Sequence, residues 1–449
     1  MIDKLRHKLG ERVDIASLAV FRVAFGLAIV IGVVRYIGYG WVEMLYLEPE
    51  YHFTYWGFDW VQPWPGEWMY VHYIVMGVLG LFIALGLYYR ASISLFFLLF
   101  TYTELIDKTA YLNHYYFISL AALLMIFMPL ERGFSLDARR KPEIKSDTAP
   151  AWVLWTLRLQ IGVVYFFAGL AKLQPDWLVD GQPMRIWLAS KSDMWLIGPL
   201  LEQAWVAHAM SIAGAAFDLT IFFFLLWPAS RAFAYVAVVI FHAATGLLFN
   251  IGLFPVIMIA LTPIFFEPDW PRRVWAWAKG LVGRREVERR PHRSRSSSRP
   301  ISKFLLAALA IWFAIQLLLP LRHLLYPGDV LWNQQGWRAS WRVMLIEKSG
   351  HLKYEIRDPD SDERWSVYPS EFLTPRQLQL AAGTPDMILQ LAHDLADDYR
   401  ERGRPNVEVY AHAHVSLNAN PSKRLVDPEV DLADEPRGPM PYEWVTERR

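Results

Sequence analysis

The stretch that decides the fold is AWVLWTLRLQIGVVYFFAGLAKLQPDWLVDG, residues 151–181. It begins with an apolar run, 151–171, that is long enough to cross a bilayer as a helix, which takes about 17–25 residues. It ends as a polar turn, and Lys172 stands where the two meet. A lysine at such a boundary either extends its ammonium to the lipid headgroups or has a chemical role.

The composition indicates that a membrane part and a soluble part share one chain. Of 449 residues, 54% are hydrophobic and 20% are charged. The length allows two domains. The formal net charge of +1 argues against a nucleic-acid-binding protein. There is no cysteine, which excludes disulfides, iron–sulfur clusters, thiolate metal sites and cysteine nucleophiles.

Apolar runs long enough to cross a membrane recur through the first two thirds of the chain, and they predict a helical transmembrane domain over residues 1–326. The first run is too long for a cleavable signal peptide and lacks a small-residue cleavage site. The nine runs cover residues 16–37, 68–88, 91–107, 115–131, 151–171, 206–228, 231–249, 251–267 and 302–322.

The charges of the connecting segments predict the orientation. Basic residues crowd the N-terminus, the 132–150 loop and the 268–301 loop, whereas the 38–67 connection has acids and neither Lys nor Arg. With nine crossings, all basic connections fall on one side, which the positive-inside rule makes cytoplasmic. We therefore expect a cytoplasmic N-terminus and an extracytoplasmic C-terminus. The block RREVERRPHRSRSSSR is expected to face anionic lipid rather than nucleic acid.

Residues 327–449 are predicted to form a small extracytoplasmic α+β domain. The segment SWRVMLIEKSGHLKYEIRDPDSDERWSVYP alternates as strands do, with turn signals at SGH and PDSD. A helix is expected over about 374–402, and NVEVYAHAHVSLN is expected to form another strand. His412 and His414 share one face of that strand and are able to chelate a metal. No third ligand lies nearby in the sequence, so a solvated strand face is preferred and no metal is predicted.

Ionisable residues inside membrane spans are functional candidates by default. If the N-terminus is cytoplasmic, His114, Lys172 and His242 lie at one level, near the outer face. Arg22 and Arg158 lie in the inner half and are expected to be structural, either snorkelling or paired with an acid. The ionisable residues within the runs are Arg22, Glu104, Arg158, Asp218 and His242, with His114 and Lys172 just outside.

This set of residues predicts base chemistry. A lysine against apolar walls is expected to be uncharged, and a neutral amine acts as a base or a nucleophile. Neutral histidines form hydrogen bonds with an oxygen anion. A pocket between helices would admit a hydrophobic substrate from the bilayer. The residues thus favour a membrane enzyme acting on a lipid-soluble molecule. A non-catalytic transporter or binding protein is the alternative, although no clear internal repeat supports a transporter.

Several motifs, in this order, resemble those of the vitamin K-dependent γ-glutamyl carboxylases, within the wider horizontally transferred transmembrane (HTTM) family. The resemblance extends from FRVAFG, residues 21–26, to DPEVDL, residues 427–432, and suggests a bacterial-type homologue. The motifs are DKTAYLNHYYF (107–117), VVYFFAGLAKLQPDW (163–177), FHAATGLLFNIGLFPVIM (241–258) and TPIFFEPDWP (262–271).

The resemblance implies roles for individual residues. Lys172, in AGLAKL, falls where the family has the amine that deprotonates the vitamin K hydroquinone. His114, after Asn113, matches the histidine that stabilises the oxygenated quinone anion. His242 matches another histidine of the same pocket. Asn113 is accordingly a candidate for substrate binding.

The resemblance also implies the reaction and its co-substrates, which are reduced vitamin K or menaquinol, O2 and CO2, without a metal. Hydroquinone and dioxygen become an epoxide through a strongly basic alkoxide. That base removes a γ-proton from a glutamate of a peptide, and CO2 adds to the carbanion. Trp341 and Arg342, in SWRVML, are candidates for contact with the peptide. The chain departs from the animal enzymes in length and in lacking cysteine. It also has Ala171 next to Lys172, where the animal enzymes tend to have paired lysines. Quinol epoxidation without carboxylation therefore stays open.

Overall fold

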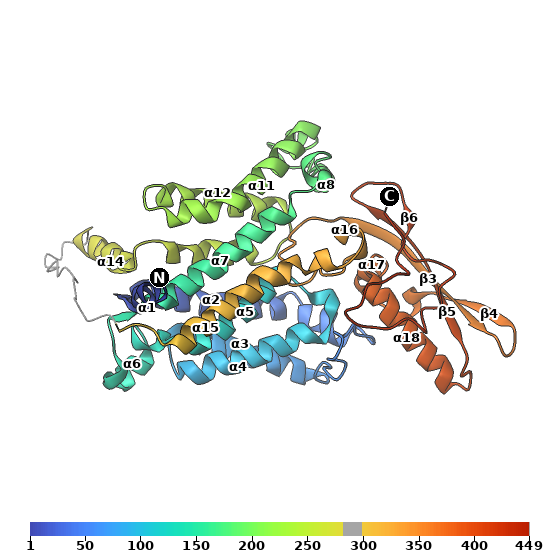
Figure 1. The fold of residues 1–449 in the computed structure, drawn as a ribbon, viewed down its shortest axis with the longest axis horizontal. Helices are drawn as coiled ribbons and strands as arrows, with labels where there is room; N and C mark the ends of the chain where they lie inside the picture. The colour runs from blue at the N-terminus through green and yellow to red at the C-terminus, as the bar shows by residue number, and fades with distance from the viewer. Residues whose placement is uncertain (282–298, 449) are drawn as a thin grey trace.

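The computed structural model describes residues 1–281 and 299–448 of the chain. A bundle of helices occupies most of the long axis, and a sheet with two helices lies at one end (Figure 1). Three short elements from the basic segments, α1 (Ile2–Gly10), α6 (Leu136–Arg140) and α14 (Trp270–Leu281), gather at the opposite end. The basic block of residues 284–299 falls outside the described residues except for Arg299, so its contact with lipid stays a prediction.

Helices form at all nine positions predicted as membrane crossings, but the count of nine crossings is not confirmed. In the described part of the chain, six helices are long and apolar enough to span a membrane. They are α2 (Ala16–Gly38), α3 (Glu67–Leu85), α7 (Ala151–Ala171), α11 (Ala204–Leu226), α12 (Arg231–Leu248) and Lys303–Leu325, which joins α15 to the 3-10 helix η6. The others are shorter or less apolar: α4 (Tyr89–Ile106), α5 (Asn113–Phe127) and α13 (Phe254–Leu261), which continues as η5 (Thr262–Phe265).

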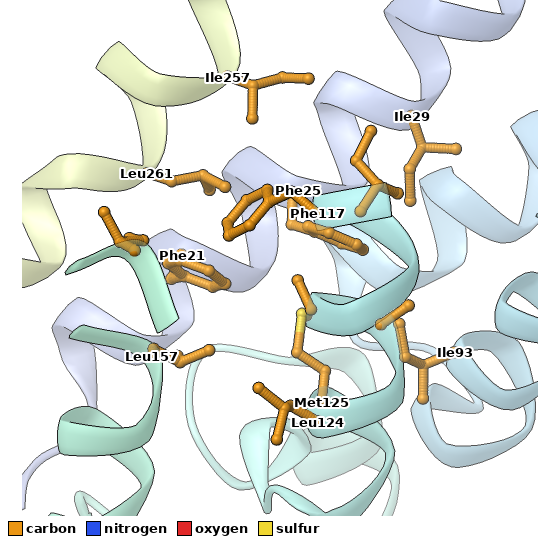
Figure 2. Close-up of a cluster of buried hydrophobic side chains, with 14 of the residues drawn as sticks. Phe21, Phe25, Ile29, Ile93, Phe117, Leu124, Met125, Leu157, Ile257 and Leu261 are labelled. Atoms are coloured by element: carbon orange, nitrogen blue, oxygen red, sulfur yellow. The ribbon is translucent and has the colours of Figure 1, made fainter. Parts of the chain in front are cut away.

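One face of helix α2 packs into the core of the bundle (Figure 2). Phe21, Phe25 and Ile29 are spaced by four residues, so they share one face of α2, and all three are buried. This face packs against side chains from α4, α5, α7 and α13, including Ile93, Phe117, Met125, Leu157 and Leu261. Gly26 allows α3 to approach closely, because a β-carbon there would lie 2.5 Å from the carbonyl oxygen of Gly80.

Arg22 and Arg158, the two arginines expected to be structural, hold backbone segments in place. Arg22 is fully buried, and its guanidinium donates to the carbonyl oxygens of Leu130 and Phe134, each at 2.7 Å. Arg158 donates to the carbonyl oxygens of Ile264 and Phe266, each at 2.9 Å. Among the described residues neither forms an ion pair, so the expectation of a structural role is met by carbonyl groups rather than by an acid.

The sheet at the other end is antiparallel, with strand order β4-β3-β5-β6. The sheet and helix core of this part includes Leu352, Tyr354 and Ile356, which alternate along β3 and are buried. The Tyr354 hydroxyl donates to the carbonyl oxygen of Ile388 in α18 at 2.8 Å. The elements are β3 (Lys348–Asp358), β4 (Glu363–Val367), α17 (Pro375–Ala381), α18 (Pro385–Glu401), β5 (Glu408–Leu417) and β6 (Lys423–Arg424).

Three details of this part differ from the sequence-based expectation. The strand begins at Lys348 rather than at residue 340. SGH is not a turn, because Gly350 lies within β3 opposite Val415, where a β-carbon would come within 3.0 Å of the valine side chain. The expected helix over 374–402 is two helices, since Pro385 begins α18. The PDSD turn is confirmed, as it joins β3 to β4.

Buried charges join the sheet part to the bundle. The carboxylate of Asp386, in α18, accepts from Lys108 at 3.1 Å and from Arg338 at 2.8 Å. Burial alone would raise the pKa of Asp386, but the charges of Arg338 and Lys108 outweigh it and hold the pKa well below its usual range. Lys108 belongs to DKTAYLNHYYF, so this motif carries the docking contact as well as His114.

We expect the stability of the protein to depend on pH through Lys348. Its ammonium donates to the carbonyl oxygens of Trp332 at 2.6 Å and Gly383 at 2.8 Å, and burial lowers its pKa from 10.5 to about 7. Between these two values the unfolded chain binds more protons than the folded one. The free energy of unfolding should therefore rise with pH in that window, by up to about 1.4 kcal/mol per pH unit.

The Lys348→Met variant isolates this effect from other titrating groups. The Tm of the wild type minus that of the variant, measured on the full chain in detergent, should increase as the pH rises from 7 towards 10.5. A difference independent of pH would show that Lys348 does not titrate in this way.

Candidate functional site

A mainly apolar cavity of about 440 Å³ lies between α7, α11 and α12. Its walls include Phe217, Phe241 and Met210, and its few polar side chains include Lys172 and His242. Lys172 directly follows the last residue of α7, and His242 lies in the last two turns of α12. The structure thus places two of the predicted catalytic residues at one cavity.

Lys172 has a charged partner. Its ammonium donates to the carboxylate of Asp218, in α11, at 2.8 Å and to the carbonyl oxygen of Ala168 at 3.2 Å. Both side chains are buried, with 6% and 8% of their surfaces exposed, and the ammonium lies 5.3 Å from the ring centre of Trp177. The expectation that the amine faces apolar walls is therefore wrong at this contact, and the expectation that it is uncharged stays a prediction. The sequence could not show that Asp218 faces Lys172, because it belongs to another helix.

The turn after α7 is anchored on two sides. Trp177 is buried, and its indole donates to the carbonyl oxygen of Ser211 in α11 at 2.7 Å. The carboxylate of Asp176 accepts from Asn418 at 2.8 Å and from Arg448 at 2.6 Å, both from the sheet part. The PDW motif thus fixes the end of α7 against both parts of the protein, and with it the position of the lysine.

His242 is enclosed and makes one side-chain hydrogen bond. Its Nε2 lies 2.9 Å from the hydroxyl of Tyr165, and only 1% of its surface is exposed. Its Nδ1 is buried and has no hydrogen-bond partner among the residues that the structure describes. One ring nitrogen is therefore held by the protein, and the other is available.

His114 lines a second cavity, of about 820 Å³, together with Asn113. The rings of His114 and His242 each lie 5.7 Å, centre to centre, from the ring of Phe254. Phe254, Val343 and Met344 line both cavities, along with Phe249 and Ile251. We call these five shared residues the partition between the two cavities. His114 lies on the side of the second cavity, and Lys172 and His242 lie on the side of the first.

The backbone of residues 339–344, which include Val343 and Met344 of the partition, is strained. Ala339, Trp341 and Met344 have φ angles of 57°, 57° and 55°, a left-handed conformation that costs a non-glycine residue about 1–3 kcal/mol. The Tyr111 hydroxyl accepts from the backbone N–H of Ala339 at 2.7 Å, and Asn113 donates to the carbonyl oxygen of Arg342 at 3.2 Å. Strain of this kind is kept where the surroundings enforce it, commonly at functional sites.

The three predicted substrate-binding residues lie in different surroundings. Asn113 lines the second cavity and holds the strained segment. The Arg342 side chain lines a third cavity, of about 1070 Å³, and its Nε has no partner among the described residues. Trp341 is 1% exposed and packs in the core, with its ring 5.0 Å from that of Tyr116.

The histidines of β5 are apart from these cavities. His412 lies opposite Lys353, with its Nε2 3.4 Å from the carboxylate of Glu355, and His414 lies opposite His351. Across residues 1–281 and 299–448, no three His, Asp or Glu side chains are grouped so as to hold a metal ion.

We expect Lys172 and Asp218 to depend on each other for stability. Asp218→Asn leaves a buried ammonium without its counter-charge, which costs about 3–5 kcal/mol in comparable buried pairs. The double variant Lys172→Met/Asp218→Leu removes both charges and should recover much of that loss in thermal unfolding of the full chain. Asp397→Asn, at an exposed carboxylate, serves as the control. A double variant that is no more stable than Asp218→Asn would contradict the pairing.

Two family models match the chain. Residues 11–270 match the model of the HTTM domain, and residues 301–449 match that of the vitamin K-dependent gamma-carboxylase, lumenal domain. No solved structure matches the chain. The first match covers more than half of the chain and includes His114, Lys172 and His242. The chain belongs to the HTTM family and carries the lumenal domain of its vitamin K-dependent gamma-carboxylases.

Proposed function

We propose that the chain is an integral membrane enzyme that couples oxygenation of a hydrophobic quinol to carboxylation of glutamate in a peptide. The observation that carries this proposal is the buried Lys172–Asp218 pair, which shares an apolar cavity with His242 in a chain of this family. The co-substrates would be reduced vitamin K or menaquinol, O2 and CO2.

The first cavity suits a quinol. Its walls are mainly apolar, as the ring and the isoprenoid chain require, and its polar groups are few. The available Nδ1 of His242 offers a hydrogen bond to a quinol oxygen, while Tyr165 orients the imidazole through Nε2. When bound, the reduced quinol together with O2 supplies the strong base that removes the γ-proton of glutamate.

The proton-accepting group is the Lys172–Asp218 pair rather than the lysine alone. We take the lysine, which is paired at 2.8 Å with a carboxylate, to hold its proton and so to have no free electron pair. Movement of that proton to Asp218 frees the amine, which then takes a proton from the quinol hydroxyl. The pair gains one proton in total. Its apolar surroundings keep out water that would otherwise compete for that proton.

The histidines would stabilise oxygen anions from two sides of the partition. His242 acts in the first cavity, and His114 acts from the second, next to Phe254. Asn113 and Arg342 would contact the peptide, and Trp341, which is enclosed in the core, would help to hold the partition in place. The roles of the two histidines and Asn113 fit a neutral imidazole and an amide, since both donate hydrogen bonds without adding charge.

We further propose nine crossings, with a cytoplasmic N-terminus and the sheet part outside. The shorter helices α4, α5 and α13 pack within the same core as α2, which supports their crossing the membrane with it. The elements from the basic segments lie at the end of the bundle opposite the sheet part (Figure 1). We place the boundary between residues 326 and 327, because η6 ends at Leu325 and the next helix begins at Val330.

The proposal is tested on purified full-length protein in lipid nanodiscs. With reduced vitamin K and O2, the wild type should form the epoxide. Lys172→Ala should lower the initial rate by about 10²–10⁴-fold, the usual contribution of a general base. Lys423→Ala, at an exposed lysine of β6, is the matched control.

Labelled bicarbonate with a glutamyl peptide tests the second half-reaction. Incorporation of label into the peptide supports carboxylation. Epoxide without label would reduce the function to quinol epoxidation, and an undiminished epoxide rate in Lys172→Ala would remove the lysine from the mechanism.

A further inference from the structure

We propose that the cavity beside His114 is the binding site for the carboxylate of the substrate glutamate, and that Arg35 and Arg376 recognise it. This inference rests on the proposed function and assigns one of its substrates to a place. The cavity has a volume of about 820 Å³ and is lined by Arg35, Arg376, Asn113 and His114, with aromatic walls.

The two guanidinium groups have hydrogen-bonding capacity to spare. Within residues 1–281 and 299–448, neither has a carboxylate within ion-pairing distance. Arg376 makes one side-chain hydrogen bond, to the carbonyl oxygen of Thr109 at 3.0 Å. Arg35 lies over aromatic rings, 5.5 Å from the ring centre of Trp41 and 5.7 Å from that of Tyr39. Each guanidinium has five N–H donors in a fork that matches a carboxylate.

Other arginines of the sheet part show what a structural pairing looks like here. Arg338 pairs with Asp386 at 2.8 Å, Arg404 with Glu363 at 2.7 Å, and Arg448 with Asp176 and another acid at 2.6 Å. Arg35, which is half-buried, and Arg376, which is exposed, differ from these arginines in having no acidic partner among the described residues. They leave the cavity with an uncompensated positive charge that an anionic ligand would neutralise.

The position of the cavity fits a peptide that arrives from the side of the sheet part. Arg35 lies in the last turn of α2, and Arg376 lies in the first turn of α17, so the cavity is formed jointly by the bundle and the sheet part. A glutamyl side chain entering there would meet one cation from each. Its carboxylate would be held next to His114 and Asn113.

The shared partition places this site next to the quinol cavity. Phe254, Val343 and Met344 line both cavities. A glutamate held by its carboxylate would present its γ-carbon near that wall, on the side opposite Lys172. The two cavities adjoin along this wall, and a reaction between the two substrates requires the side chains of the wall to let the γ-carbon through to the quinol-derived base.

A variant of Glu104 tests whether peptide binding depends on the positive charge of the site. It lines a small neighbouring cavity of about 60 Å³ that also includes Arg35. If the site works by positive charge, removing this carboxylate should leave peptide affinity unchanged or increase it. If any disturbance of these walls weakens binding, Glu104→Gln should weaken it as Arg35→Gln does.

The experiment measures binding and turnover separately on full-length protein in nanodiscs. A short fluorescent glutamyl peptide is titrated without quinol, and its anisotropy gives Kd. Arg35→Gln and Arg376→Gln should each raise Kd at least tenfold, Arg35→Lys should have an intermediate effect, and the glutamine analogue of the peptide should bind weakly to the wild type. Arg364→Gln, at an exposed arginine of β4, is the matched control.

Turnover distinguishes the two proposals. In an active protein, the arginine variants should raise KM for the peptide in label incorporation far more than they lower kcat. Peptide binding that depends on both arginines, in a protein that forms no epoxide, would keep this site and reject the proposed reaction. An active protein whose arginine variants bind the peptide with unchanged Kd would overturn this inference alone, as would weakened binding in Glu104→Gln.

Discussion

The ion pair between Lys172 and Asp218 is the interaction on which the rest of the site depends. Removing two charges from water costs several kcal/mol for each ion, so such a pair persists only where the geometry is held firmly. Here α7 and α11 approach closely at Gly169, where a β-carbon would lie 2.6 Å from the backbone nitrogen of Leu219. Gly169 of the AGLAKL motif thus allows the two helices to approach, and Lys172 of the same motif reaches Asp218.

The pairing also limits when Lys172 can accept a proton. An isolated neutral amine would accept a proton from any acid that reached it, including water. A lysine bound to Asp218 can do so only after giving up a proton to its partner, and that transfer is sensitive to what fills the apolar cavity beside it. In the proposed mechanism, these two buried charges act together as one base, and His242 and Tyr165 complete the polar end of the same cavity.

The sequence allowed much of this to be predicted, since long apolar runs, charge asymmetry and strand alternation are local properties. It placed the helices, the α+β part, and Lys172 and His242 near one level. The Asp218 contact could not be predicted, because spacing within one helix does not say which face meets another. The strained turn at Trp341 and Met344 is not local either, since Tyr111 and Asn113 impose it from the bundle. The prediction of a turn at Gly350 was wrong for a related reason, because the close neighbour of Gly350, Val415, comes from a strand far away in the sequence.

The partition makes the first cavity depend on residues from outside the helical bundle. Val343 and Met344 precede β3 and enter the chain after the last apolar helix, yet they complete the wall of a cavity formed by α7, α11 and α12. A helical bundle inherited without its companion would keep the lysine and its acid but would have an open side. A change of side-chain size at Val343 or Met344 would therefore alter the wall of a cavity whose other residues belong to the helical bundle.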